Sequence, residues 1–292
     1  MPAAEVESGV RLRFVDTHGL RLHVAEAGPE DGPLVILLHG FPEFWYGWRH
    51  QIPALAAAGF RVWAPDQRGY NLSDKPSPVR AYRLAELVDD VLGLIDAQGR
   101  ERAALVGHDW GAAVAWVAAA RAPARVSRLA ILNVPHPAVM LRHLRRSLRQ
   151  LVRSGYIAFF QIPRLPEAML QARRWGGLSQ LLLRSSRPDT FSDVDLRRYR
   201  ESWSQPGALT AMLHWYRAGF RYGSDLSTLG RVRPRCLMLW GVQDVALGQE
   251  MAQPSIEMCD DGRLVFIEEA THWVQHDARA RVNAELLAFL RE

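Results

Sequence analysis

Short runs of aliphatic and β-branched residues recur along this chain, and stretches with helical periodicity separate them. Each run is largely apolar on both faces, which is typical of strands in a parallel sheet that helices cover on both sides. The runs lie at residues 34–38, 61–64, 103–106, 129–132, 236–240 and 264–267. Two earlier runs, 11–16 and 20–27, alternate in polarity and meet at a His-Gly pair, which indicates an edge hairpin. The sequence therefore predicts an α/β fold with a doubly wound, mostly parallel sheet.

The alternation of strands and helices stops after residue 132 and resumes near residue 232. Arginine-rich helical stretches, interrupted by prolines and a glycine pair, fill the interval. Open α/β sheets bind their ligands at the carboxyl ends of the strands, so we expect the insertion to lie over that edge. The predicted division is a core of residues 1–134 and 225–292 with an inserted helical cap at residues 135–224.

The charge of the chain is divided in the same way. The 292 residues carry 36 Lys and Arg against 31 Asp and Glu, a formal net charge of +5. Residues 135–224 contain 15 arginines and 5 acidic residues, so the predicted cap carries +10 and the predicted core −5. Salt screens a net surplus as small as +5, and we therefore expect no nucleic-acid partner.

One segment of the predicted cap combines arginines with leucines at helical spacing. The arginines are Arg142, Arg145, Arg146, Arg149 and Arg153, and the leucines are Leu141, Leu144, Leu148 and Leu151. Such a helix could lie on a membrane or bind nucleic acid as a basic, non-catalytic surface. We expect instead an ordinary cap helix with its leucines facing inward and its arginines in solvent.

The two cysteines, Cys236 and Cys259, are too few for a disulfide framework and lack the spacing of a zinc site. The first residues are polar and acidic, unlike a secretory signal. The longest uninterrupted apolar stretch, residues 112–120, is about half of the roughly 20 residues that a membrane span needs. We expect a cytoplasmic monomer or homodimer with no metal, no cofactor and no stable membrane insertion.

The predicted strand 103–106 runs into Gly107-His108-Asp109-Trp110-Gly111, and a helical stretch follows at once. Small residues on both sides of Asp109 allow the sharp turn in which a hydrolase presents its nucleophile. Serine is common at the centre of this turn, but here the central residue is an aspartate. The alternative interpretation is that Asp109 is only a helix N-cap, a position that aspartate favours.

A second motif, His39-Gly40-Phe41-Pro42, follows the predicted strand 34–38. Hydrolases of this architecture supply one backbone N–H of an oxyanion hole from this loop, and the residue after the nucleophile supplies the other. We therefore assign the two donors to Phe41 and Trp110.

The remaining partners of the nucleophile are expected at later strand ends, in the order acid and then histidine. Asp244 follows strand 236–240 and His272 follows strand 264–267, whereas His276 is expected to be solvated. No carboxylate follows strand 129–132, which leaves Asp244 as the candidate acid.

Asp66 also follows a predicted strand and could compete as the nucleophile. It lacks the small residues that the sharp turn requires. We expect it to have a structural role, paired with Arg68.

An aspartate nucleophile predicts attack on a saturated carbon, because a carboxylate is ionised at neutral pH and needs no base. The product of that attack is an alkyl ester of Asp109. His272 would then activate the water that hydrolyses the ester, and Asp244 would fix its tautomer. An epoxide oxygen leaves as a basic alkoxide and needs an acid, which a tyrosine can supply, whereas a halide needs only N–H donors.

Three segments resemble the α/β-hydrolase-fold epoxide hydrolases: residues 39–46, residues 66–70 and residues 107–111. The resemblance covers essentially the whole chain and implies the α/β-hydrolase fold, with an apolar epoxide and water as substrates. It implies that Tyr156 and Tyr216 are the cap tyrosines that hold the epoxide oxygen, and it supports His272 in Thr271-His272-Trp273. Four aromatic residues are then expected to line an apolar pocket, namely Trp45, Phe159, Trp215 and Trp273.

The nearest alternative is a haloalkane dehalogenase, which also uses an aspartate at this turn and a tryptophan after it. The chain has Phe41 where many dehalogenases have a polar halide-binding side chain, and a tyrosine pair has no role in halide release. A fluoroacetate-type dehalogenase is disfavoured because it would have arginine in place of Trp110.

Overall fold

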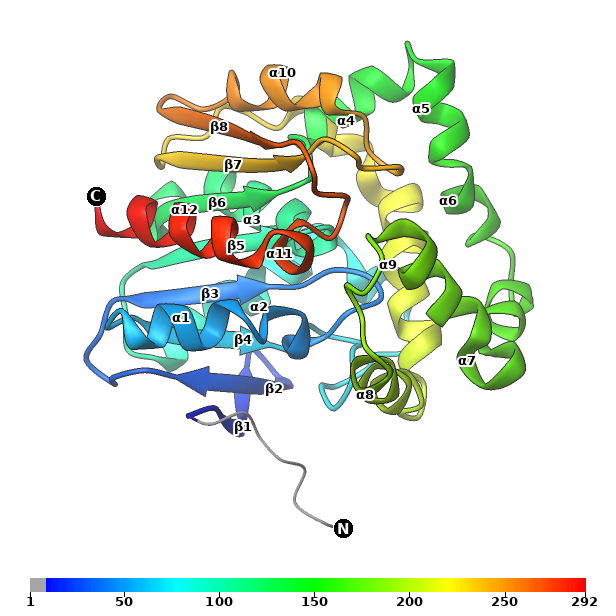
Figure 1. The fold of residues 1–292 in the computed structure, drawn as a ribbon, viewed down its shortest axis with the longest axis horizontal. Helices are drawn as coiled ribbons and strands as arrows, with labels where there is room; N and C mark the ends of the chain where they lie inside the picture. Colours follow the sequence, from blue (N-terminus) through cyan, green and yellow to red (C-terminus); the bar gives the residue numbers. More distant parts are fainter. Residues whose placement is uncertain (1–8) are drawn as a thin grey trace.

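The computed structural model describes residues 9–292, apart from the side chains at positions 224 and 225. It contains an eight-stranded sheet in the order β1-β2-β4-β3-β5-β6-β7-β8 (Figure 1). The strands are β1 (Arg11–Thr17), β2 (Leu20–Ala27), β3 (Leu34–Leu38), β4 (Arg61–Pro65), β5 (Ala103–His108), β6 (Val126–Leu132), β7 (Cys236–Gly241) and β8 (Gly262–Ile267). β2 pairs antiparallel with β1 and β4, and all other neighbours are parallel. The predicted α/β fold and edge hairpin are confirmed.

Helices cover both faces of the sheet. In the view of Figure 1, α1, α11 and α12 lie in front of the strands and α2 and α3 lie behind them. The helical elements of the core, outside the segment between β6 and β7, are η1 (Trp45–Trp48), α1 (Gln51–Ala57), η2 (Val79–Tyr82), α2 (Leu84–Ala97), α3 (Trp110–Arg121), η3 (Pro123–Arg125), η5 (Gln249–Met251), α10 (Ala252–Ile256), α11 (Val274–Asp277) and α12 (Arg279–Arg291). Every residue of β3 and β4 is buried, as the apolar runs 34–38 and 62–64 predict, and the one charged residue among them, Arg61, pairs with Glu26 at 2.6 Å.

A set of helices joins β6 to β7 and lies beyond the carboxyl ends of the parallel strands (Figure 1). They are α4 (Pro137–Leu144), α5 (Leu148–Arg153), α6 (Gly155–Phe159), α7 (Leu165–Ser185), α8 (Asp193–Trp203), α9 (Ala208–Tyr222) and η4 (Gly223–Thr228). Within α7 the backbone leaves the helical conformation at residues 172–175. We call the helices α4 to α9 the helical cap. Among residues 9–292, no helix is both long and apolar enough to cross a membrane.

Polar contacts join the cap to the core. Trp203 donates its indole N–H to the carbonyl oxygen of Pro42 at 2.6 Å. Asp195 of α8 accepts a hydrogen bond from the Tyr46 hydroxyl at 3.0 Å and pairs with Arg49 at 3.2 Å. These contacts hold the cap above the strand ends.

Two predicted strands begin later than the strands in the structure. β6 begins at Val126 and β8 at Gly262, three and two residues before the predicted starts. The first residues of β8 are exposed because β8 is an edge strand, and the second residue of β6 is also exposed. Apolar runs therefore mark only the buried parts of these strands.

The expectation that the leucines of the basic cap segment face inward is half wrong. Leu141 and Leu144 line a cavity, but Leu148 and Leu151 are 81% and 54% exposed. The reason is that α5 turns Gln150, rather than a leucine, toward the protein interior, where this side chain is buried.

Candidate active site

A sharp turn joins β5 to α3 and presents Asp109. The residue has φ 49° and ψ −124°, a positive-φ conformation that non-glycine residues rarely adopt. A Cβ atom on Gly107 would lie 2.6 Å from the Ala112 Cα, and one on Gly111 would collide with the Leu38 carbonyl. The small residues are therefore required because strand, turn and helix are in direct contact. Asp109 occupies the N-cap position of α3, but its carboxylate makes no capping hydrogen bond there, which contradicts the interpretation of Asp109 as only a capping side chain.

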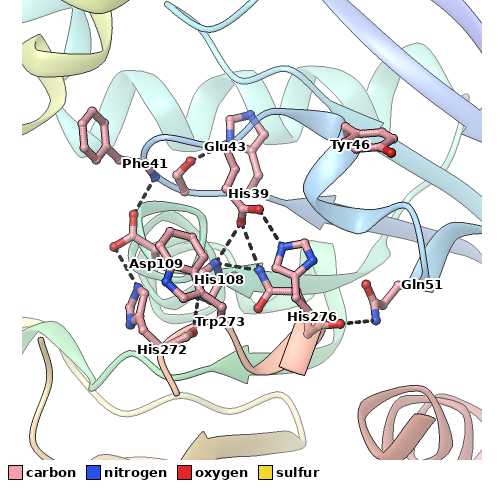
Figure 2. Close-up of polar contacts among 12 residues, drawn as sticks. His39, Phe41, Glu43, Tyr46, Gln51, His108, Asp109, His272, Trp273 and His276 are labelled. Atoms are coloured by element: carbon pink, nitrogen blue, oxygen red, sulfur yellow. Dashed lines mark hydrogen bonds and ion pairs between the residues drawn. The ribbon is translucent and has the colours of Figure 1, made fainter. Parts of the chain in front are cut away.

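The Asp109 carboxylate lies between a backbone donor and a histidine (Figure 2). The N–H of Phe41 donates to Oδ1 at 2.7 Å, and Nε2 of His272 lies 3.6 Å from Oδ2. Burial alone would raise the pKa of Asp109, but His272 and the Phe41 N–H hold it below its usual value. The carboxylate is thus ionised at neutral pH, with one oxygen fixed by the backbone.

Asp244 orients His272 from the opposite side of the imidazole ring. Oδ2 of Asp244 lies 2.7 Å from Nδ1 of His272. Oδ1 of Asp244 accepts from the N–H groups of Ala246 at 2.7 Å and Leu247 at 2.9 Å. His272, the Asn133 amide and the Leu247 N–H together outweigh burial and lower the pKa of Asp244. The predicted acid, histidine and nucleophile therefore meet at one edge of the sheet.

The protonation of His272 depends on both carboxylates. Burial alone would lower its pKa, but Asp244 and then Asp109 outweigh that effect and raise it to about 10. His272 is therefore an imidazolium at neutral pH while both aspartates are ionised.

Asn133 fixes the loop that carries Asp244, a role that we did not predict. Its amide donates to Oδ2 of Asp244 at 2.8 Å, and its Oδ1 accepts from the N–H of Gly241 at 2.8 Å. Asn133 has φ 54°, a conformation that asparagine tolerates better than most residues. In the sequence, the position of Asn133 directly after a buried strand was the observation that could have indicated this role.

A cavity of about 520 Å³ opens beside the nucleophile. Asp109, Trp110, Tyr156 and Tyr216 line it, together with apolar side chains of the cap such as Leu144. The rings of Tyr156 and Tyr216 are 5.8 Å apart, and Tyr216 meets the Trp110 ring edge-on at 5.1 Å. Tyr216 is buried and Tyr156 is 37% exposed as a whole residue, and in both the desolvation of the phenol and then the Asp109 charge raise the pKa, so both hydroxyls remain protonated.

None of the four aromatic residues predicted for the pocket is among those that line this cavity. The indole N–H of Trp215 donates to the Arg68 carbonyl at 3.0 Å, and that of Trp273 donates to Ser185 at 2.9 Å. Trp45 is buried in the core and Phe159 packs beside the buried Phe160. These rings stabilise the cap and the core, and aliphatic side chains form most of the cavity wall.

Asp66 is a structural residue, but not through Arg68. The carboxylate of Asp66 accepts hydrogen bonds from the backbone N–H of Trp45 at 2.9 Å and from the side-chain amide of Asn71 at 2.7 Å. Arg68 instead forms a bidentate salt bridge with Asp90, in which Nε and Nη2 each lie 2.6 Å from a carboxylate oxygen. The predicted pair between Asp66 and Arg68 is wrong because Arg68 turns toward α2.

Behind the turn lies a buried polar network that sequence reasoning missed (Figure 2). His108, the residue before the nucleophile, lies with Nε2 2.8 Å from the carbonyl oxygen of His272. Its Nδ1 accepts from Gln275 at 3.1 Å, and Gln275 also donates to Glu43 at 3.0 Å. The network thereby connects the turn at Asp109 to the backbone of the loop that carries His272.

Glu43 is the centre of the network. It accepts hydrogen bonds from the Tyr199 hydroxyl of the cap at 2.6 Å and from Nε2 of His276 at 2.7 Å. Burial alone would raise the pKa of Glu43, but His276 and His108 hold it well below its usual range. The expectation that His276 is solvated is wrong, since this residue is 7% exposed and Arg49 donates to its Nδ1. In the sequence, the position of Glu43 directly after the Phe41-Pro42 pair was the one observation that could have indicated its role in this network.

No cluster of His, Cys, Asp or Glu side chains within residues 9–292 has the arrangement of a metal site. The Asp109 carboxylate and the side chains of Tyr156 and Tyr216 line the cavity, and the imidazole of His272 lies beside Asp109.

A family model described as the alpha/beta hydrolase fold matches residues 33–278. The chain is 48% identical to the AB hydrolase superfamily protein YfhM of Bacillus subtilis (strain 168), over 97% of this chain and 99% of that protein. It is 38% identical to Epoxide hydrolase 4 of Mus musculus, over 96% of this chain and 79% of that protein. The crystal structure of the Bacillus megaterium epoxide hydrolase in complex with an inhibitor superimposes with a TM-score of 0.88 at 31% identity, covering 96% of this chain and 100% of that one.

The two carboxylates around His272 predict a measurable titration. In an NMR pH titration, the imidazole of His272 should show a pKa near 10. Asp109→Asn removes one of the two negative charges, so the pKa should fall by at least about one unit. Equal values in both proteins, near the ordinary 6.5, would contradict the assignment.

The same shift has a consequence for stability. A group whose pKa is raised on folding stabilises the protein below its unfolded pKa, and this contribution is lost as the pH rises through the folded value. The wild type should therefore lose more unfolding free energy between pH 8 and 10 than Asp109→Asn does.

The close packing at the turn predicts that Gly111→Ala is costly. The added methyl group would collide with backbone, so the free energy of unfolding should fall by about 1–3 kcal/mol in urea. Gly155→Ala is the matched control because a methyl group added there would have no neighbour within 4 Å, and its effect should stay within about 0.5 kcal/mol. Equal effects of the two substitutions would show that the turn tolerates a side chain.

Proposed function

The chain belongs to the α/β-hydrolase-fold family and is a hydrolase that acts on epoxides, and we propose that it opens the ring through a covalent ester of Asp109. The observation that carries the proposal is the position of the Asp109 carboxylate, between the Phe41 N–H and His272 on the wall of a cavity lined by two tyrosines. The helices α4 to α9 act in this proposal as a cap that supplies those tyrosines.

In the first step, Oδ2 of Asp109 attacks a ring carbon and the bond from that carbon to the epoxide oxygen breaks. Oδ1 accepts the Phe41 N–H at 2.7 Å, whereas the contact of Oδ2 with His272 is longer, at 3.6 Å, so Oδ2 is the oxygen that attacks. The developing alkoxide takes a proton from a phenol of the Tyr156 and Tyr216 pair. The raised pKa of both phenols supports this role, since each hydroxyl is protonated and able to donate before the reaction.

Ester formation also prepares the base for the second step. The ester has no negative charge, so one of the two carboxylates that raise the pKa of His272 is lost. The imidazolium can then release its proton to the tyrosinate through solvent in the cavity. This transfer restores the phenol and leaves His272 neutral.

In the second step, neutral His272 takes a proton from water, and the hydroxide attacks Cγ of Asp109. The negative charge develops on Oδ1, where the Phe41 N–H already donates and where the N–H of Trp110 is assigned as the second donor. Collapse of this intermediate expels the diol oxygen, which takes the proton of the new carboxyl group. Asp244 holds the imidazole by its Nδ1 throughout. The balance is one epoxide and one water consumed for each diol formed.

We predict that Asp109→Asn lowers diol formation from a styrene-type epoxide by at least about a thousandfold, because an amide is a poor nucleophile. Replacing both Tyr156 and Tyr216 by Phe should slow ester formation by about 10²–10⁴-fold, the usual contribution of a positioned acid. Tyr222→Phe is the matched control, since this tyrosine is exposed and is not among the residues lining the cavity. Single-turnover kinetics measure each effect.

The same proteins should be offered a bromoalkane. Halide release without diol formation from any epoxide would contradict the proposal and favour a dehalogenase. Full activity of the double Phe variant on epoxides would remove the tyrosines from the mechanism.

A further inference from the structure

The short helix α5 presents its apolar face to solvent and its polar side chain to the protein. Leu148, Leu151 and Val152 occupy one face at positions i, i+3 and i+4, and they are 81%, 54% and 80% exposed. Gln150 is buried on the other side. An ordinary surface helix has the opposite arrangement, with its apolar face against the core.

Hydrogen bonds fix this inverted orientation. The amide of Gln150 donates to the carbonyl oxygen of Ala246 at 2.9 Å, and its Oε1 accepts from the N–H of Gly248 at 3.2 Å. Turning the apolar face inward would break both bonds and bury polar groups without partners. The outward aliphatic face is therefore set by the fold, and exposed apolar patches of this kind mark interaction surfaces.

The exposed face belongs to a helix that is flanked on both sides by residues of the active-site cavity. The residues before α5, Leu144 and Arg145, line the cavity, and so do Tyr156 and Ile157 after it. In Figure 1, α5 stands at the outer edge of the cap, beyond the strand ends. Phe220 of α9 also lines the cavity and is 69% exposed. Exposed apolar side chains of α5 and α9 therefore lie beside residues that line the cavity.

The charge around this face favours an anionic partner. Residues 135–166 contain six arginines and no acidic residue. Four of the arginines, at positions 142, 145, 146 and 149, are exposed, and none of these four forms an ion pair with any residue in the described part of the chain. A second copy docked face to face would bring these arginines against one another, which is repulsive.

We propose that the outer face of α5 docks the enzyme on an anionic lipid surface. Leu148, Leu151 and Val152 enter the boundary between headgroups and acyl chains, and the neighbouring arginines contact the anionic headgroups. The docked orientation directs the cavity opening toward the lipid, where apolar compounds concentrate. The contact is peripheral and reversible, and it does not depend on the catalytic mechanism.

Vesicle sedimentation tests the proposal with phosphatidylglycerol–phosphatidylcholine vesicles and with phosphatidylcholine alone. Wild-type protein should bind the anionic vesicles at least tenfold more tightly than the neutral ones, and salt should weaken the binding. A triple variant, L148Q/L151Q/V152Q, should lose at least tenfold in affinity. The matched control is M169Q/L181Q/L183Q, which changes three exposed apolar residues of α7 in the same cap and should bind like the wild type.

Two further measurements complete the test. The α5 variant should hydrolyse a short water-soluble epoxide at the wild-type rate, because its three substituted residues are not among those lining the cavity. Equal binding of anionic vesicles by the wild type and the α5 variant, or no binding by either, would overturn the proposal. A concentration-dependent dimer that only the α5 variant disrupts would overturn it in favour of a second copy as the occupant.

Discussion

The site depends on one backbone constraint, the positive-φ conformation of Asp109 at the junction of β5 and α3. The turn brings the start of α3 so close to β3 that Gly111 touches the Leu38 carbonyl. The same contact sets the carboxylate against the N–H of Phe41, since the Phe41 loop follows β3 directly. Nucleophile and backbone donor are thus positioned by packing between neighbouring strands rather than by flexible side chains.

The negative charges of Asp109 and Asp244 set the protonation of the groups around the nucleophile. Asp244 and Asp109 together hold a proton on His272, and the Asp109 charge adds to burial in raising the pKa of the two cavity tyrosines. In the proposed mechanism, loss of the Asp109 charge is the event that converts the histidine into a base. The buried carboxylate of Glu43 ties the backbone of this site to the cap through Tyr199. Core and cap are therefore joined by polar contacts directly behind the reacting groups.

The sequence was informative where a local pattern determines geometry. Apolar runs predict buried strands, and glycines around an aspartate after such a run predict the turn. The order of Asp244 and His272 along the chain follows from the order of the strands. The pocket aromatics could not be placed in this way, because Trp215 and Trp273 pack according to which cap helix meets which loop. The same limit applies to Glu43 and His276, whose contact joins residues 233 positions apart. α5 was mispredicted because a buried glutamine, rather than leucine periodicity, sets its orientation.

The most direct test of the covalent mechanism is a single turnover in water enriched in ¹⁸O, with enzyme in excess over epoxide. Because Asp109 supplies the oxygen that first bonds to carbon, the diol from that turnover should contain no ¹⁸O. The label should instead appear in the peptide that carries Asp109. A diol that is fully labelled in the first turnover, with an unlabelled Asp109, would mean that water attacks the epoxide directly and would contradict the mechanism.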